Sequence, residues 1–347
     1  MKQRINIVEL ARHLGLAVST VSKAINDRGD VSDATKRRVL EAAEKFGFSP
    51  DPAGRRLRTQ TSETIGFVLS PPQTHFAHPF FLDLLMGIDQ SLSQTPFQLI
   101  IVAGRTLETE LESFRRLVER QRVDGVMFGR TRRDDPRIRY LQERNVPFVA
   151  LGRSETGKPF PFVDIDRTVA GRNGTARFVG FGHRRIGLLS TPGYLMISHL
   201  LQEGYRAALK AAKLPFDADL VVETSTSEEG GLNGARQLLA MSNPPTAIMC
   251  GHDLIATGAM QAIAETGRRP GADVPVIGCD NHPLGPYLNP PPLTTFSAPT
   301  FEAGRRMVEL LLALLDGRSP KELQEIWSPE LILRSSHGGQ LVAANEI

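Results

Sequence analysis

The chain has 347 residues, of which 41% are hydrophobic and 23% are charged, and its net charge is +3. This composition excludes disordered and collagen-like proteins, and the length indicates two or three folding units. The charge is unevenly distributed, because residues 1–60 hold 12 Lys and Arg against 7 Asp and Glu, whereas the remainder holds 29 against 31. A segment of net +5 beside a body of net −2 is typical of a polyanion-binding segment or of a solvated basic face.

The two cysteines, Cys250 and Cys279, each follow an apolar run. We interpret them as small buried hydrophobic residues in a reducing compartment. The sequence opens without a charged leader followed by an apolar stretch, and no apolar run reaches about 18 residues. We therefore expect a cytoplasmic protein with no signal peptide and no membrane partner.

Residues 1–48 have the pattern of three short helices. Apolar residues at positions 7, 10, 11 and 14 share one helix face, which ends at Gly15, and a second helix follows at 18–26. A third helix begins at Ser32 or Asp33 and stops at Gly47. The residues expected to face inward from it are Val39, Leu40, Ala43 and Phe46. Two short helices joined by a tight glycine turn predict a helix-turn-helix, although a generic three-helix bundle has the same pattern.

The second helix is expected to turn Val18, Ser19, Ser22 and Lys23 outward. In a major groove, Val18 can contact a thymine methyl group and Ser19 can bond a base or a phosphate. Lys23 can reach the O6 and N7 atoms of guanine. Together with the basic charge of this segment, these side chains favour DNA binding.

The remainder of the chain alternates short apolar runs with helical periodicity. Residues 49–62 contain two prolines and three arginines and are typical of a linker. The expected strands lie at 65–69, 97–102, 125–128, 148–151, 186–189, 246–250 and 274–278, and the clearest helices at 81–92, 108–120, 169–181 and 254–265. Apolar strands that alternate with helices predict βαβ units and parallel sheets. The length of this part suits two doubly wound sheets.

The order of motifs resembles that of the lactose/galactose-repressor (LacI/GalR) family. The residues that carry the resemblance lie at 7–26, 31–32, 36–39, 46–50, 78–81, 123–126, 146–149, 182–186, 252–253, 276–280 and 292–295. The resemblance implies an N-terminal all-α helix-turn-helix (three-helix) head plus a hinge helix. It also implies an α/β periplasmic-binding-protein-like body of two Rossmann-like parallel-sheet subdomains.

The resemblance also assigns domain boundaries and DNA contacts. Residues 1–48 are expected to form the DNA-binding domain, 49–62 the hinge helix and 63–340 the body. The N-subdomain is expected at about 63–162 and 293–325, and the C-subdomain at about 163–292 and 326–340, with chain crossings near 162, 292 and 325. In the family, a hinge-helix leucine that corresponds to Leu57 wedges into the minor groove of the operator. The expected DNA contacts are Ile7, Val18, Ser19, Thr20, Ser22, Lys23, Asn26, Ala53, Arg56 and Leu57.

The resemblance places a ligand in the cleft between the two subdomains. Parallel sheets bind ligands at the carboxyl ends of their strands, and polar residues follow several predicted strands. The expected effector contacts are His78, Phe80, Arg130, Arg153, His252, Asp253 and Asp280. Arginine and carboxylate suit bidentate bonds to sugar hydroxyls, and an aromatic ring suits an apolar sugar face. Asp253 is equally compatible with a helix N-cap, and His183 and Arg184 with a structural role.

The effector itself is less closely defined, because the sequence departs from the family pattern. Many sugar-responsive members carry an arginine at the position of Leu201 and an asparagine at that of His252. Without that arginine, a ligand contact has moved or the ligand differs. The stretches at 130–137 and 151–153 are more similar to members that respond to glucosides or other plant-type sugars.

The resemblance implies a transcription repressor that binds palindromic, double-stranded operator DNA as a homodimer under control of a small carbohydrate effector. One alternative is a cytoplasmic sugar-binding protein, and another is a carbohydrate enzyme that uses Asp280 with Asp164 or Asp166. The sequence lacks a P-loop, a nucleophile elbow and zinc-binding motifs. We therefore expect no enzymatic activity, no metal site and no cofactor.

Overall fold

The computed structural model describes residues 5–25, 31–48, 61–71, 79–104, 106–107, 109–120, 123–281 and 291–338. The chain forms two compact units, Met1–Ser62 and Glu63–Ile347, which divide where the predicted linker ends. The predicted contacts Asn26, Ala53, Arg56, Leu57 and His78 lie outside the described residues, and so does most of the predicted hinge helix. Within the described ranges, every helix is too short or too polar to cross a membrane.

The first unit contains α1 (Ile7–Leu14), α2 (Val18–Ile25) and α3 (Asp33–Phe46). The buried residues at its centre are Leu10, Ala11, Val21, Ala24, Val39 and Ala42. Leu40, which was predicted to face inward, is instead 54% exposed. The inward stripe of α3 runs through Val39 and Ala42, and Leu40 lies about 100° further round the helix from Val39.

Capping residues set the helix ends in this unit. Asn6 and Glu9 form a capping box at the start of α1. Gly15 and Gly47 end α1 and α3 in the left-handed conformation, with φ of 66° and 63°, as predicted. Ser32 is the N-cap of α3, and its side chain accepts from the first turn. These caps satisfy backbone groups at the helix ends, which have no partner within the helix.

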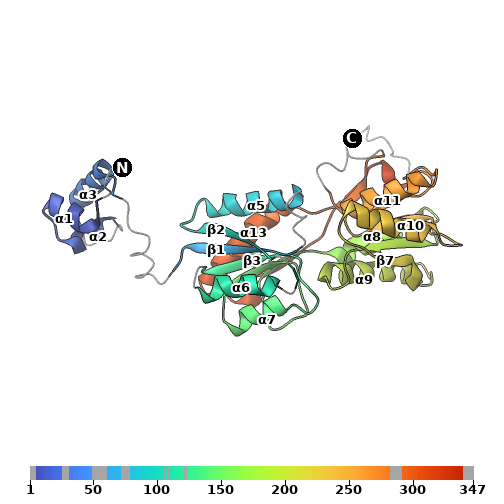
Figure 1. Cartoon of the computed structure of the whole chain (residues 1–347), viewed down its shortest axis with the longest axis horizontal. Coiled ribbons are helices and arrows are strands. Elements are labelled where there is room, and N and C mark those ends of the chain that lie inside the picture. The colour runs from blue at the N-terminus through green and yellow to red at the C-terminus, as the bar shows by residue number, and fades with distance from the viewer. Residues whose placement is uncertain are drawn as a thin grey trace. The chain divides into compact units, whose positions relative to one another are not determined.

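The second unit begins with the N-subdomain, whose sheet has the strand order β11-β5-β4-β3-β1-β2 and only parallel pairs. Its strands are β1 (Thr64–Leu69), β2 (Gln98–Ala103), β3 (Gly125–Phe128), β4 (Phe148–Leu151), β5 (Phe162–Ile165) and β11 (Gln324–Trp327). One face is covered by α5 (Pro79–Leu92) and α13 (Thr300–Leu315), and the other by α6 (Glu110–Glu119) and α7 (Pro136–Glu143) (Figure 1). Alternate strand residues therefore enter two separate cores.

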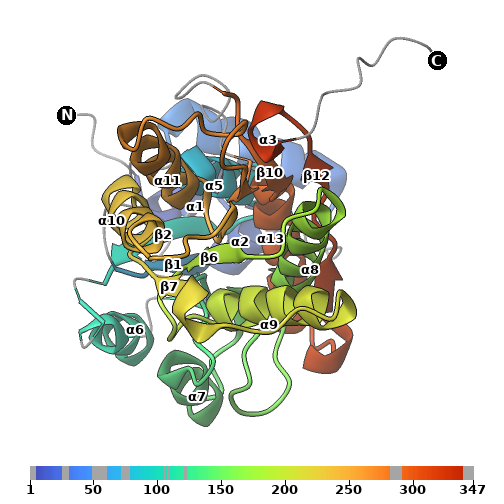
Figure 2. The same ribbon diagram turned by 90° about the vertical axis from the view of Figure 1, so that its right-hand side faces the viewer.

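The C-subdomain sheet has the order β12-β10-β9-β8-β6-β7, and only β12 runs antiparallel to its neighbour. Its strands are β6 (Ile186–Ser190), β7 (Val221–Glu223), β8 (Ala247–Cys250), β9 (Val276–Asp280), β10 (Thr294–Ser297) and β12 (Leu331–Ile332). One face is covered by α8 (Arg167–Gly180) and α9 (Met196–Ala211), and the other by α10 (Glu228–Leu239) and α11 (Asp253–Glu265) (Figure 2). Short 3-10 helices lie at Ala218–Leu220, Pro320–Glu322 and Ser335–His337. The two cysteines are free and fully buried in this subdomain, as predicted.

The chain crosses between the subdomains three times, each time a few residues later than predicted. The crossings follow β5, β10 and β11, so the predicted boundaries near 162, 292 and 325 are wrong by a few residues. β5 belongs wholly to the N-subdomain and β10 to the C-subdomain, because each strand stays in register with its neighbour for its full length. The first crossing is therefore at Asp166, which caps α8.

Candidate functional site

The first candidate site is the outward face of α2. Val18 is 41% exposed and Ser19 is exposed, whereas Val21 and Ala24 are buried in the core. Ser22 and Lys23, like Thr20, are half-buried. Val18 and Ser19 therefore face outward as predicted, whereas Ser22 and Lys23 are exposed only in part. A short helix that presents a methyl group, hydroxyls and a cation has the chemistry to read base edges in a major groove.

Ile7, also expected to contact DNA, is the first residue of α1. Its side chain is half-buried and packs against the core of the unit. Its position therefore combines a packing role with a place at a helix N-terminus, where phosphates bind readily.

The second candidate site is a cavity of about 140 Å³ in the body. It lies at the carboxyl ends of β1 and β3, between which the strand order of the N-subdomain reverses. Such a switch point is where open parallel sheets bind ligands. The apolar side chains that line it include Phe67, Phe81, Leu84, Leu151, Ile165 and Ile197, and the polar residues are Ser70, Arg130, Asp164, Arg167, His252 and Asp280.

Three polar residues of the C-subdomain form a connected group on the cavity wall. Asp280 ends β9 in a left-handed backbone conformation with φ of 105°, and its Oδ1 accepts from Arg167. Its Oδ2 lies 3.2 Å from His252 Nε2. His252 Nδ1 accepts from the backbone N–H of Leu254, so the tautomer that carries hydrogen on Nε2 fits both contacts. Burial alone would lower the pKa of Arg167, but the charge of Asp280 raises it overall.

Arg130 contributes a cation from the N-subdomain to the same cavity. It follows β3 and has a left-handed backbone with φ of 52°. Burial lowers the pKa of Arg130, and the Tyr194 side chain opposes this change. The cavity thus has a guanidinium on one subdomain and a carboxylate on the other, which suits a ligand with several hydroxyl groups.

Asp164 and Arg153 form a different arrangement from the one predicted. Arg153 Nε lies 2.9 Å from Asp164 Oδ2, but among the described residues neither atom has hydrogen-bond geometry. Burial raises the pKa of Asp164 to about 6, and the charge of Arg153 opposes this rise. Arg153 also donates to Asp166 at 2.7 Å. Because its side chain is directed at these two carboxylates, Arg153 does not line the cavity, and its predicted effector contact is not supported by the geometry.

Asp253 also differs from the prediction. His252, and not Asp253, is the N-cap of α11. Asp253 is buried and accepts from the hydroxyl of Thr295 at 2.6 Å, and it does not line the cavity. Its position one residue inside the helix turns the side chain toward β10 and away from a ligand. The Phe80 side chain lies outside the described part of the chain.

Of the predicted effector contacts, the structure therefore brings together Arg130, His252 and Asp280. Sequence reasoning missed Ser70 and Arg167. Ser70 directly follows β1, and Arg167 directly follows the Asp166 cap, so both carried the same signal of position after a strand.

Two further expectations concern residues away from the cavity wall. His183 contacts the Thr246 hydroxyl at 2.9 Å, and Arg184 donates to the Val179 carbonyl, in agreement with their structural role. The carboxylates suggested for an enzyme each have a cationic partner, Arg167 for Asp280 and Arg153 for Asp164 and Asp166. That pairing favours a binding site over a pair of catalytic acids.

Two family models match the chain. "Bacterial regulatory proteins, lacI family" matches residues 6–51, and "Periplasmic binding protein-like domain" matches residues 175–337. The HTH-type transcriptional regulator AglR of Rhizobium meliloti (strain 1021) is 33% identical over 339 residues, which cover 96% of this chain and 94% of AglR. The HTH-type transcriptional regulator CelR of Thermobifida fusca is 32% identical over 339 residues, which cover 96% of this chain and 99% of CelR.

Solved structures agree with these sequence relatives. The structure of the "transcriptional regulator CelR-cellobiose complex" has a TM-score of 0.74 at 31% identity and covers 96% of this chain and 100% of its own. A lac repressor dimer bound to operator has the same fold, with a TM-score of 0.82 at 24% identity over 96% of this chain and 99% of its own. The sequence relatives are transcription regulators and not enzymes. This chain belongs to the lacI family of bacterial regulatory proteins and is a DNA-binding transcription regulator.

Proposed function

We propose that this regulator is a repressor, that it binds a palindromic operator as a homodimer, and that a small carbohydrate in the cavity controls it. The observation that carries the proposal is the composition of the cavity wall. Arg130 from one subdomain and Asp280 with Arg167 and His252 from the other surround an apolar floor that includes Phe67. A sugar offers hydroxyls to the charged groups and an apolar face to the floor.

The relatives support a sugar effector. CelR has been solved in complex with cellobiose, and it shares 31% identity with this chain. Leu201, where many family members carry an arginine, is buried and has no guanidinium to form a bidentate hydrogen bond with the ligand. We infer that Arg130, which lies on the opposite subdomain, is the guanidinium that binds the sugar here.

Control of DNA binding follows from linkage. Both subdomains contribute to the cavity wall, so a bound sugar favours one arrangement of the subdomains over others. If the operator also favours one arrangement, sugar and operator each change the affinity for the other by the same factor. If the sugar and the operator favour the same arrangement, the sugar tightens DNA binding. If they favour different arrangements, the sugar promotes release of DNA.

A homodimer is supported by an apolar surface of the N-subdomain. Exposed apolar side chains on α5 and β2 are Leu82, Met86, Ile100 and Ile101. β2 is the last strand of its sheet, and an exposed apolar edge strand is normally covered by a partner. A second copy of the chain would cover this edge, and the dimer would then have two α2 helices, one for each half of a palindrome. Because its partner is operator DNA, we propose that the regulator acts in the cytoplasm, at the nucleoid.

The DNA contacts can be tested by base preference. Lys23→Ala should relax the preference at one operator position, with a loss of about 1–3 kcal/mol for the preferred base. Lys45→Ala, which removes the same charge from the last turn of α3, is the matched control. Gel-shift titrations against single-base operator variants measure both. Equal loss on every operator variant would make Lys23 a phosphate contact instead. Leu57→Ala should weaken operator binding and leave the body folded.

The effector can be tested by a thermal-shift screen with cellobiose and related glucosides. A sugar at 100 times its Kd should stabilise the protein by about 2.7 kcal/mol. The same sugar should then change operator affinity in a gel shift, and its concentration should not fall on prolonged incubation with the protein. If no carbohydrate shifts the melting temperature while the operator still binds, the sugar part of the proposal is wrong. Measurable turnover of cellobiose would favour the enzyme alternative.

A further inference from the structure

Arg130 is a cation of the cavity wall that has no carboxylate partner in the described chain. It follows β3 and lines the cavity from the N-subdomain, where it is partly buried. Among the described residues no carboxylate forms an ion pair with its guanidinium, whereas Arg132, Arg137 and Arg167 each have one. A cation that is withdrawn from water loses hydration, and an opposite charge normally compensates this loss.

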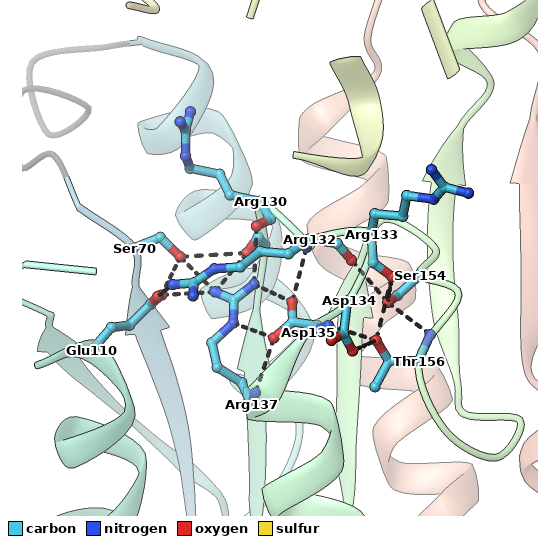
Figure 3. Close-up of polar contacts among 11 residues, drawn as sticks. Ser70, Glu110, Arg130, Arg132, Arg133, Asp134, Asp135, Arg137, Ser154 and Thr156 are labelled. Carbon is cyan, nitrogen blue, oxygen red and sulfur yellow. Dashed lines mark hydrogen bonds and ion pairs between the residues drawn. The ribbon is translucent and has the colours of Figure 1, made fainter. Parts of the chain in front are cut away.

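The carboxylates of a neighbouring buried ion cluster are already occupied by other arginines (Figure 3). Glu110 accepts from Arg137 at 2.7 Å through one carboxylate oxygen and from Arg132 at 2.5 Å through the other. Both oxygens of Asp135 accept from Arg137, at 2.9 and 2.6 Å. Two carboxylates and two guanidinium groups therefore balance each other within the cluster, and it offers no excess negative charge to Arg130.

The Arg130 side chain points away from this cluster (Figure 3). Its backbone is nevertheless held by the cluster, because Arg137 donates to the backbone carbonyls of Gly129 and Arg130. Arg130 also has a left-handed backbone, with φ of 52°, which is uncommon for a residue with a long side chain. The cluster thus fixes the backbone from which Arg130 extends, while the guanidinium remains on the cavity wall.

The two carboxylates on the cavity wall also have guanidinium partners of their own. Asp280 forms an ion pair with Arg167, and Asp164 Oδ2 lies 2.9 Å from Arg153 Nε. The segments 72–78 and 282–290, which continue the chain after β1 and β9, contain no aspartate and no glutamate. These parts of the chain consequently supply no counter-charge for Arg130.

We propose that Arg130 is an anion subsite, and that the carbohydrate effector carries a carboxylate or phosphate group that binds there. The proposal rests on the proposed function, in which a sugar occupies the cavity, and it names the class of that sugar. A guanidinium binds carboxylate and phosphate through paired hydrogen bonds, which are about twice as strong as neutral ones. Because like charges repel, the acidic group is directed to Arg130 and away from Asp280, which gives the ligand one orientation.

The native chain tests the proposal with pairs of a neutral sugar and its acidic derivative. The pairs are methyl β-glucoside with methyl β-glucuronide, cellobiose with cellobionate, and glucose with glucose 6-phosphate. Calorimetric titration at fixed ionic strength should show at least one pair in which the acid binds about tenfold more tightly, equivalent to about 1.4 kcal/mol. The pair that shows this preference distinguishes a carboxylate from a phosphate. If every neutral sugar binds as tightly as its acid, the proposal is wrong.

The variant Arg130→Gln tests whether Arg130 is the residue that distinguishes the two sugars. It removes the charge and keeps an N–H donor, so the acid and the neutral sugar of the preferred pair should bind within about twofold of each other. Arg133→Gln is the matched control, because it removes an exposed guanidinium of the same loop, which is paired with Glu155 at 2.7 Å. The control should keep the tenfold preference. A tenfold preference that persists in Arg130→Gln would overturn the assignment.

Thermal melting without ligand separates this proposal from the proposed function. Because Arg130 has no carboxylate partner in the described chain, Arg130→Gln should melt at the native temperature or above it. Arg132→Gln, which removes a partner of Glu110, should melt at a lower temperature. An equal loss in the two variants would make Arg130 a structural cation and would overturn the subsite. A native chain that binds operator but no sugar, neutral or acidic, would count against the proposed function, and the melting temperatures would still decide the role of Arg130.

Discussion

Two buried arginines, one in each part of the body, have opposite roles. Arg137 in the N-subdomain and Arg167 in the C-subdomain both stand in the first turn of a helix, after a capping aspartate. A cation is unfavourable at that end of a helix, so each requires a carboxylate partner. Arg137 is enclosed by acceptors of its own subdomain, whereas Arg167 and its partner Asp280 remain on the cavity wall. The difference teaches that access of a ligand to the ion pair, and not burial of the arginine, separates a structural site from a binding site.

The strongest test of this contrast is Arg137→Met. It leaves Glu110 and Asp135 buried without their cation, and removal of one partner from a buried pair costs about 3–5 kcal/mol. Urea denaturation followed by the fluorescence of Trp327, the single tryptophan, reports on the N-subdomain sheet directly. Arg115→Met, which breaks an exposed pair with Glu112, should cost less than about 1 kcal/mol. Similar losses in the two variants would show that the cluster contributes little to stability.

The second test uses pH. The pKa of Asp164, about 6 in the folded chain because of burial, lies above its ordinary value. The folded state then binds more protons than the unfolded state between about pH 4 and 6, so stability falls as pH rises through this window. The loss from this residue is about 3 kcal/mol. Asp164→Asn should remove this slope and leave the protein more stable at pH 7, as measured by urea denaturation at several pH values.

Asp135 in the structural cluster should show the opposite pH dependence. Burial alone would raise the pKa of Asp135, but the charge of Arg137 and hydrogen bonds lower it below its ordinary value. Its contribution to stability is therefore present above the ordinary carboxyl pKa and is lost as pH falls through the lowered value. If stability of Asp164→Asn still falls with the native slope between pH 4 and 6, the assignment of that slope to Asp164 on the cavity wall is wrong.

The third test is Asp280→Asn, which removes the charge of Asp280 but keeps a side-chain oxygen that can accept from Arg167. Asparagine tolerates the left-handed backbone at this position, where φ is 105°. Loss of the charge should weaken cellobiose binding about tenfold, because the carboxylate accepts hydroxyl hydrogen bonds more strongly than an amide does. Calorimetric titration measures the affinity. Asp217→Asn, which breaks a partly exposed pair with Arg185, is the control and should leave it unchanged. Native affinity in Asp280→Asn would place the ligand elsewhere.

Features that depend on one residue or one short segment were predicted better than contacts between residues far apart in the sequence. Gly15 and Gly47 were correctly predicted to end helices, because a left-handed cap depends on the residue itself. Arg130, His252 and Asp280 follow or end strands of two different sheets, and the structure places them on one cavity as predicted, because parallel sheets bind ligands at the carboxyl ends of their strands. Arg153 follows a strand in the same way, but its direction depends on Asp164 and Asp166, which a separate strand and a crossing supply. Such non-local partners leave no periodicity in the sequence.

The smallest expected effect belongs to Ser70, which lies between the two regions compared above. Ser70 lines the cavity, yet its hydroxyl donates to Glu110 at 2.5 Å and accepts from Arg137 at 2.7 Å. Because the cluster already uses this hydroxyl, Ser70→Ala should cost about 1 kcal/mol of stability. It should change cellobiose affinity by less than about twofold, equivalent to about 0.4 kcal/mol. A tenfold loss of affinity would instead make the hydroxyl a ligand contact, and the structural cluster and the binding site would then be one network.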